Sequence, residues 1–240
     1  MIRLDRFLAN MGRGTRKEVK KLIAAGAVTV NGTAATDCGM QVDPQADDIS
    51  VCAERVPYRP FVYLMMNKPA GVLSASEDAG GALTAAGLVA EEYAHYRLSP
   101  AGRLDKDSEG FLILTNDGEY IHNVISPLKH VDKLYFCRLE REISEEDIAA
   151  FANGVILGDG FVCLPAVLKR AAVSRKEDPA ALVTIREGKF HQVKRMFAAR
   201  KNKVIYLKRI RIGGVSLDER LTPGEYREMT EAEKERVIHE

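Results

Sequence analysis

The sequence GRLDKDSEG (residues 102–110) runs directly into the apolar sequence FLILT (residues 111–115). The first part is polar and bounded by glycines, which is typical of a loop, and the second is predicted to be a buried strand. Catalytic side chains are often held on loops that a rigid strand fixes in place. Arg103 lies two residues before Asp105, and a nearby cation keeps a carboxylate ionised. From the pattern alone, Asp105 is either a catalytic carboxylate or part of a solvated acidic turn.

Apolar runs of strand length recur on both sides of this stretch, together with two helical segments. Ser144 is followed by Glu146 and Asp147, which is typical of a helix start because acidic side chains stabilise the positive helix end. This helix is predicted over 144–153, and a second one over 189–200. The predicted strands are 61–66, 111–115, 134–139, 155–157, 166–168, 182–185 and 204–212. Together they predict a mixed α+β domain.

The N-terminal residues predict a separate, smaller domain. Residues 3–11 have apolar side chains at helical spacing, and Thr15 with Glu18 forms a capping-box pattern for a second helix over 15–25. A short strand at 28–30 then leads into an Asn-Gly turn. Prolines 57 and 60 predict an extended linker. We therefore expect one domain with its linker over residues 1–58 and a larger one over 59–240.

Basic residues are concentrated in two regions, although the net charge of the 240-residue chain is only +1. Residues 1–32 carry seven Lys or Arg against two acids, and residues 185–214 carry ten against one. Two basic regions on an otherwise acidic chain indicate a surface for a phosphate backbone, or they are merely solvated faces. The residues expected to contact nucleic acid are Arg3, Arg13, Arg16, Lys17, Lys20, Lys21, Lys189, Lys208 and Arg209.

Composition excludes several classes of protein. No stretch reaches the roughly 18 to 20 apolar residues that span a bilayer, and the charged N-terminus is unlike a signal peptide. We therefore expect a cytoplasmic protein with no membrane partner. The cysteines are far apart, at Cys38, Cys52, Cys137 and Cys163, so no metal site is expected. No glycine-rich nucleotide loop is present, and no organic cofactor is expected.

The N-terminal pattern resembles the S4 RNA-binding module. It runs from Arg3-Leu4-Asp5 to Gly26-x-Val28-x-Val30-Asn31-Gly32, so the resemblance covers about residues 1–50. It implies a small, helix-rich domain that docks on structured RNA. A basic face on the helix 15–25 fits this role, because Lys and Arg bind phosphates without reading sequence.

Four ordered motifs resemble those of the RsuA-type pseudouridine synthases. They are NKPAG (67–71), GRLD (102–105), SPLKHVDKLY (126–135) and EGKFHQVKRMF (187–197). Four motifs in one order, over nearly the whole chain, are far more specific than one. The resemblance implies a larger domain with a mixed, mainly antiparallel β-sheet flanked by helices, the pseudouridine synthase fold.

The same resemblance implies roles for individual residues. Asp105 matches the catalytic aspartate, which either attacks the anomeric carbon of a flipped uridine or removes a sugar proton to give a glycal. Tyr135 matches the tyrosine that stacks on the target base, and Lys194 matches the basic residue that pairs with the aspartate. Supporting roles are expected for Arg103, Arg195 and Lys68, with Arg195 either sharing the role of Lys194 or binding phosphate.

Three further positions affect this interpretation. His191 is expected to be structural, since the family uses an aspartate for its chemistry. Leu128 and Leu134 depart from the usual motif, and both lie close in sequence to Tyr135. Neither departure removes a catalytic group, but both bear on the fine positioning of Tyr135.

The predicted function is conversion of a uridine in ribosomal RNA to pseudouridine. The segments 191–199 and 212–227 resemble the small-subunit (16S) branch of the family most. A large-subunit (23S) enzyme of the same family and a non-catalytic RNA-binding ribosome assembly factor are the alternatives. The expected partner is ribosomal RNA, naked or in an assembly intermediate, and the enzyme is expected to be a monomer.

Overall fold

The computed structural model describes residues 1–171 and 179–239. They divide into two compact units, described separately below. The N-terminal unit contains Met1–Val62 together with Ala90–Arg97, and the C-terminal unit contains Tyr63–Val89 and Leu98–Glu240. Residues 90–97 therefore belong to the N-terminal unit although 27 residues of the other unit precede them, which no sequence pattern indicated. No helix of the described residues is long and apolar enough to cross a membrane.

The N-terminal unit packs two helices against short strands. The apolar faces of α1 and α2 form its core, with Leu4, Phe7 and Leu8 on α1 and Val19 and Ile23 on α2 all buried. The capping box predicted at the start of α2 is present, since Thr15 and Glu18 bond reciprocally. The elements are β1 (Ile2–Arg3), α1 (Leu4–Asn10), α2 (Arg16–Ala24), β2 (Val28–Val30), β3 (Thr33–Ala34), β4 (Gln41–Val42), β5 (Ile49–Val51), β6 (Glu54–Arg55) and the 3-10 helix η2 (Glu91–Tyr96).

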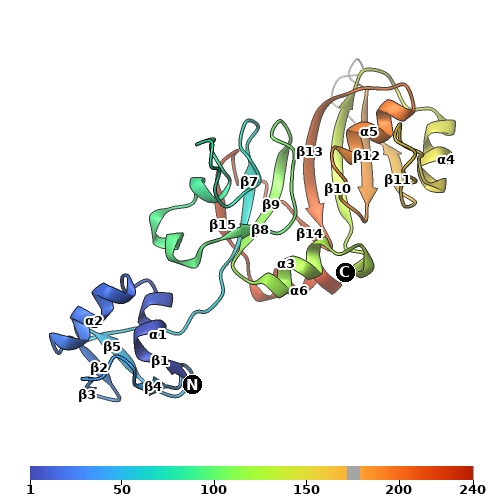
Figure 1. Cartoon of the computed structure of the whole chain (residues 1–240). Coiled ribbons are helices and arrows are strands. Elements are labelled where there is room, and N and C mark those ends of the chain that lie inside the picture. The colour runs from blue at the N-terminus through green and yellow to red at the C-terminus, as the bar shows by residue number, and fades with distance from the viewer. Residues whose placement is uncertain (172–178, 240) are drawn as a thin grey trace. The chain divides into compact units, whose positions relative to one another are not determined.

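The C-terminal unit is built on one large sheet with the order β11-β12-β10-β13-β9-β7-β15 (Figure 1). Among these neighbours only β9 and β13 run parallel, so the predicted mixed, mainly antiparallel sheet is confirmed. Its strands are β7 (Tyr63–Lys68), β8 (Ser99–Pro100), β9 (Glu109–Thr115), β10 (Lys133–Leu139), β11 (Val167–Arg170), β12 (Ala180–Ile185), β13 (Val204–Ile212), β14 (Val215–Ser216) and β15 (Tyr226–Glu228).

Helices lie beside two parts of this sheet. Figure 1 shows α4 (Glu145–Asn153) and α5 (Gln192–Ala199) beside the end that contains β11 and β12. The helices α3 (Gly118–Ile125) and α6 (Glu231–His239) lie together near β14. Two short 3-10 helices, η1 (Ala86–Leu88) and η3 (Pro127–Lys129), complete the unit.

One local sequence interpretation was wrong. Residues 155–157 were predicted to be a strand, but they form only an isolated bridge between Ile156 and Val162. After β9, the chain leads through Asp117 directly into α3, which begins at Gly118. The Asp117 carboxylate accepts hydrogen bonds from the backbone amides of Glu119 and Tyr120 and so caps that helix.

The parallel pair β9–β13 joins the two parts of the sheet through a close backbone contact. Gly110 on β9 pairs with Arg209 on β13 and has a φ of +104°. A Cβ atom at Gly110 would lie 2.2 Å from the carbonyl oxygen of Arg209. Both the backbone angle and the space therefore require glycine here.

We predict that Gly110→Ala destabilises the protein by about 3 kcal/mol or more, because the new methyl group overlaps backbone that cannot move independently. Gly118→Ala is the matched control, since a Cβ there meets no atom within 4 Å. That change should be neutral or stabilising by about 0.5 kcal/mol. Urea unfolding followed by circular dichroism measures both, and equal midpoints for the two variants would contradict the packing argument.

Candidate active site

Asp105 lies on the loop before β9, and backbone bonds hold this loop on both sides. The Ser74 hydroxyl donates to the carbonyl oxygen of Leu104 at 2.9 Å and accepts from the Leu104 amide at 3.0 Å. The carbonyl of Asp105 accepts from the amide of Ser108, and that of Lys106 from the amide of Gly71. The side chain of Asp105 is 21% exposed. The loop thus presents one partly exposed carboxylate from a fixed backbone.

Lys194 brings a cation to this carboxylate from α5. Its Nζ lies 3.0 Å from Oδ2 of Asp105 and 2.6 Å from Oδ1 of Asp107. Burial disfavours the charged lysine, but the hydrogen bonds to Asp107 and Asp105 outweigh it and raise the pKa of Lys194. The hydrogen bond from Lys194 likewise lowers the pKa of Asp107. The lysine therefore stays charged at neutral pH and supplies Asp105 with a permanent counter-ion.

The two other basic residues near Lys194 in the sequence, Arg195 and His191, make different contacts. Arg195 pairs with Asp159 and also donates to the carbonyl oxygen of Phe190, so its guanidinium is engaged away from Asp105. Nε2 of His191 lies 3.7 Å from Oδ1 of Asp105, and its ring stacks on Phe190. His191 thus belongs to the surroundings of the carboxylate.

Tyr135 and Arg209 are paired across β10 and β13. Both are buried, with 6% and 2% of their surface exposed. Nη1 of Arg209 donates to the Tyr135 hydroxyl at 3.4 Å, and its Nε donates to the carbonyl of Phe111 at 2.7 Å. Its Nη2 is buried without a hydrogen-bond partner among the described residues. Arg209 was expected on a basic RNA-binding surface; the structure places it inside the sheet, in contact with Tyr135.

Lys68 is fully buried at the end of β7, so it is not a surface lysine. Its Nζ donates to the carbonyl oxygens of Pro69 and, at 3.4 Å, Lys106, which ties it to the Asp105 loop. Burial lowers the pKa of Lys68 to about 8, although Glu109, Asp107 and Asp105 act in the opposite direction. Those three acids therefore lie close enough to Lys68 to influence its charge.

Lys133 is a second buried lysine, to which sequence reasoning assigned no role. Its Nζ donates to the carbonyl of Val131, and burial, together with Arg209, lowers its pKa to about 8. The signal for it is the alternation along β10, because Lys133 shares the buried face with Tyr135 and Cys137. A lysine on an apolar strand face is unusual, because burial of a charged ammonium group is unfavourable.

Among the described residues no group of three His, Cys, Asp or Glu could hold a metal ion.

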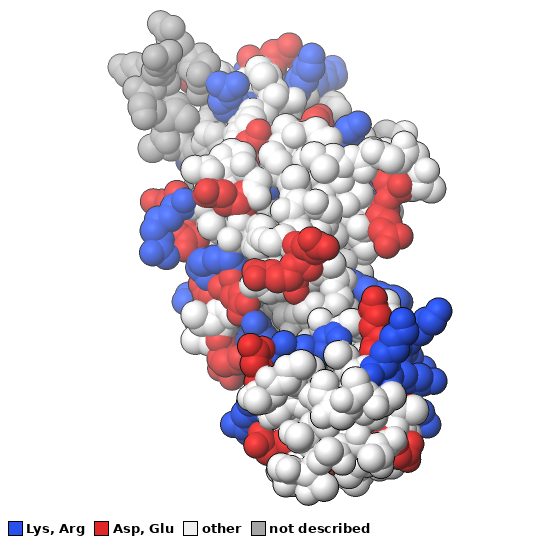
Figure 2. Space-filling view, turned by 90° about the vertical axis from the view of Figure 1, so that its left-hand side faces the viewer, with Lys and Arg blue, Asp and Glu red and all other residues white. Residues whose placement is uncertain are grey.

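The predicted RNA contacts of the N-terminal unit are mostly exposed. Lys17, Lys20 and Lys21 lie on the solvent side of α2, and Figure 2 shows Lys and Arg gathered on this unit. Arg3 instead makes two hydrogen bonds of 3.1 Å to the buried Asp5, which gives it a structural role as well. In the C-terminal unit, Arg103 and Lys189 are exposed and Lys208 is half-buried.

Comparison with known proteins shows to which family of proteins the chain belongs. Residues 62–199 match the RNA pseudouridylate synthase family and residues 2–48 match the S4 domain. The chain belongs to the RNA pseudouridylate synthase family, and it is a pseudouridine synthase with an N-terminal S4 domain.

Several pseudouridine synthases are similar to this chain over nearly its full length. The chain is 49% identical to an uncharacterised RNA pseudouridine synthase of Bacillus subtilis, covering 97% of this chain and 96% of the relative. It is 41% identical to the ribosomal small subunit pseudouridine synthase A of Vibrio cholerae, covering 97% of each. A crystal structure of a pseudouridylate synthase, 36% identical, superposes with a TM-score of 0.67 and covers 99% of this chain and 100% of that one.

We predict that Lys194→Met lowers the single-turnover rate of pseudouridine formation roughly 100-fold, because Asp105 loses a pre-oriented cation. Lys194→Arg keeps the charge and should retain more of the rate. Arg195→Met is the control on the same helix, since Arg195 pairs with Asp159. Rates measured with saturating RNA decide the matter, and equal losses for Lys194→Met and Arg195→Met would refute a specific role for Lys194.

We predict that replacing Lys17, Lys20 and Lys21 by glutamine weakens RNA binding. The slope of log affinity against log salt should fall by about 1 for each lysine that contacts phosphate. Arg55→Gln is the control, because Arg55 lies in the same unit but on β6, where it pairs with Asp48. An unchanged slope in a salt titration of the triple variant would rule out docking through this face.

Proposed function

We propose that this enzyme isomerises one uridine of small-subunit (16S) ribosomal RNA, with Asp105 as the catalytic carboxylate. The observation that carries the proposal is the ion pair between Asp105 and Lys194, 3.0 Å long, on a loop whose backbone is fixed. A partly exposed carboxylate with a permanent counter-ion suits reaction at a sugar carbon. Full-length similarity to small-subunit enzymes supports the substrate.

The chemistry requires the target uridine to leave the stacked helix, because its sugar and base edges are inaccessible inside a duplex. The Asp105 carboxylate then either adds to C1′, releasing the uracil N1, or removes a sugar proton to form a glycal. In both routes uracil leaves as its N1 anion and rotates until C5 faces C1′. In the first route C5 attacks C1′ and displaces the Asp105 carboxylate, and in the second C5 adds to C1′ of the glycal while the sugar carbon takes its proton back from Asp105. The proton on C5 is then lost and N1 gains one, so the product is an isomer of uridine. Lys194 keeps a positive charge beside the carboxylate until it reacts.

Tyr135 and Arg209 are proposed to form the wall against which the uracil rotates. The hydrogen bond from Arg209 and the burial of both side chains fix the tyrosine ring. An aromatic ring in this position stacks on a flipped base and limits its movement. Arg209 therefore acts as a positioning residue for Tyr135.

The basic face of α2 is proposed to hold ribosomal RNA, naked or in an assembly intermediate, while the uridine enters the C-terminal unit. The ion pair between Asp105 and Lys194 forms within one chain, so the proposed reaction needs no residue from a second copy, and we propose that the enzyme acts as a monomer. Because ribosomal RNA is made and modified in the cytoplasm of bacteria, we propose that the enzyme works there. No metal or organic cofactor takes part in the proposed reaction.

The test is mapping of pseudouridines in 16S and 23S RNA from cells that lack the gene, complemented with the wild type or Asp105→Asn. We expect one 16S site to disappear, to return with the wild type, and to stay absent with Asp105→Asn. Purified Asp105→Asn should still bind RNA, since no phosphate contact is removed. A missing site in 23S RNA would reassign the substrate, and normal conversion by Asp105→Asn would exclude the mechanism.

A further inference from the structure

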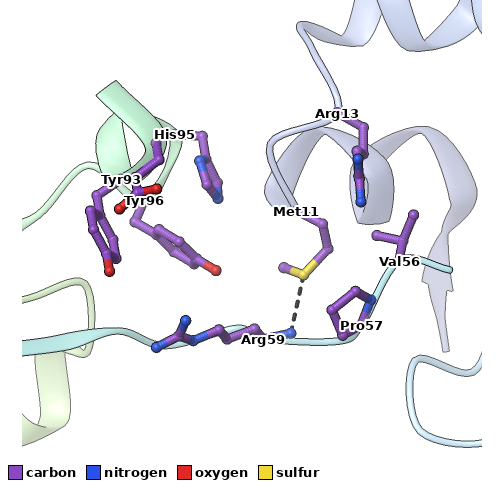
Figure 3. Close-up of a pocket in the computed structure, with 9 residues that line it drawn as sticks. Met11, Arg13, Val56, Pro57, Arg59, Tyr93, His95 and Tyr96 are labelled. Atoms are coloured by element: carbon purple, nitrogen blue, oxygen red, sulfur yellow. Dashed lines mark hydrogen bonds between the residues drawn. The ribbon is translucent and has the colours of Figure 1, made fainter. Parts of the chain in front are cut away.

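The N-terminal unit contains a cavity of about 270 Å³ (Figure 3). One wall comes from the chain that leaves α1 and from the linker, and the other from η2. The backbone amide of Arg59 donates to Sδ of Met11 at 3.1 Å across its base. The lining residues are Met11, Arg13, Val56, Pro57, Arg59, Glu92, Tyr93, His95 and Tyr96.

Three aromatic rings define one side of this cavity. The rings of His95 and Tyr96 have centroids 4.0 Å apart, and Tyr93 lies 6.5 Å from Tyr96. The imidazole of His95 packs closely on Gly12, since a Cβ on Gly12 would lie 2.8 Å from ring atoms of His95. Burial lowers the pKa of His95, so its ring is neutral at neutral pH. Neutral, tightly placed rings are suited to stacking on another flat ring.

Polar groups of two kinds complete the lining. Arg13 and Arg59 bring two guanidinium groups, which bind phosphate through paired N–H donors. Glu92 is the one carboxylate of the lining, and it can accept a hydrogen bond from an imino or amino group of a base. The rings and the carboxylate suit a base, and the guanidinium groups suit a phosphate.

We propose that this cavity binds one unpaired nucleotide, with the base stacked on Tyr93 or Tyr96 and the phosphate held by Arg13 and Arg59. Base stacking on tyrosine combined with arginine contacts to the backbone is a general mode of single-strand recognition. The inference rests on the RNA binding in the proposed function and adds a second nucleotide subsite, apart from the one that holds the target uridine.

Chain position favours RNA as the source of this nucleotide over a free mononucleotide. Arg13 lines the cavity, and α2 with its exposed lysines begins three residues later, at Arg16. An RNA stem lying along α2 would therefore reach the cavity with a single-stranded extension. Phosphate contacts along α2 are blind to sequence and pairing, so the cavity would let the protein prefer a junction between paired and unpaired RNA.

The experiment measures the affinity of the full chain for a hairpin with a single-stranded extension. The reference is the same RNA with its extension paired to a complementary strand, at equal salt. We expect the wild type to prefer the open extension roughly tenfold. Tyr93→Ala combined with Tyr96→Ala should abolish this preference. Tyr58→Ala is the matched control, because this exposed tyrosine of the same unit stacks on Phe7 outside the cavity lining.

Two further measurements make the test independent of folding and of activity. In the wild type, 5-iodouridine in the extension should crosslink under ultraviolet light to peptides containing residues 56–59 or 90–97. The urea midpoint of the double tyrosine variant should match that of the wild type, and uridine conversion is measured with the wild type alone. A failure of the proposed function therefore appears in the conversion by the wild type, and a failure of the subsite appears in the binding preference.

Two outcomes would overturn the proposed subsite: a double variant that keeps the wild-type preference, and crosslinks found only in other peptides. Competition by millimolar UMP or AMP that the double variant does not show would identify a free nucleotide as the source of the same chemistry. Absence of competition, with the preference lost in the double variant, would support RNA as the source.

Discussion

The parallel pairing of β9 with β13 is the contact on which the rest of the C-terminal unit depends. It is made possible by Gly110, whose lack of a side chain lets the backbone of Arg209 approach closely. The Asp105 loop leads directly into β9, and Tyr135 is the β10 partner of Arg209. One backbone contact therefore lies beside the Asp105 loop and beside Tyr135.

Charge is arranged around this contact at a cost to stability. Lys68, Lys133 and Arg209 are all nearly inaccessible to water, and burial of a cation is unfavourable unless its surroundings compensate. Carbonyl oxygens accept hydrogen bonds from each of them, while the carboxylates of the Asp105 loop act on Lys68. A site with buried positive charge favours anions, and both the Asp105 carboxylate and an RNA backbone are anionic.

Much of this organisation could be predicted from the sequence, and the limits have physical causes. Apolar runs identified the main strands, but α6 was missed because Val237 is its only buried residue. Lys194 and Arg195 are adjacent on a helix, about 100° apart, so only the rotation of α5 decides which one faces Asp105. Arg209 looked like part of a basic surface because a run of charges does not reveal which side of a strand faces inward. Asp105 itself became the candidate catalytic residue only through the four ordered motifs, because its local sequence fits a solvated acidic turn as well.

The placement of residues 90–97 in the N-terminal unit also affects how this protein can be divided into fragments. The N-terminal unit is not a continuous piece of sequence, since η2 reaches it from within the C-terminal segment. A fragment that stops at Val62 would leave Met11 and its neighbours without the rings of Tyr93, His95 and Tyr96. Removal of residues 1–62 alone would likewise leave η2 without the residues that it contacts on α1. The N-terminal unit therefore cannot be exchanged as one continuous piece of sequence.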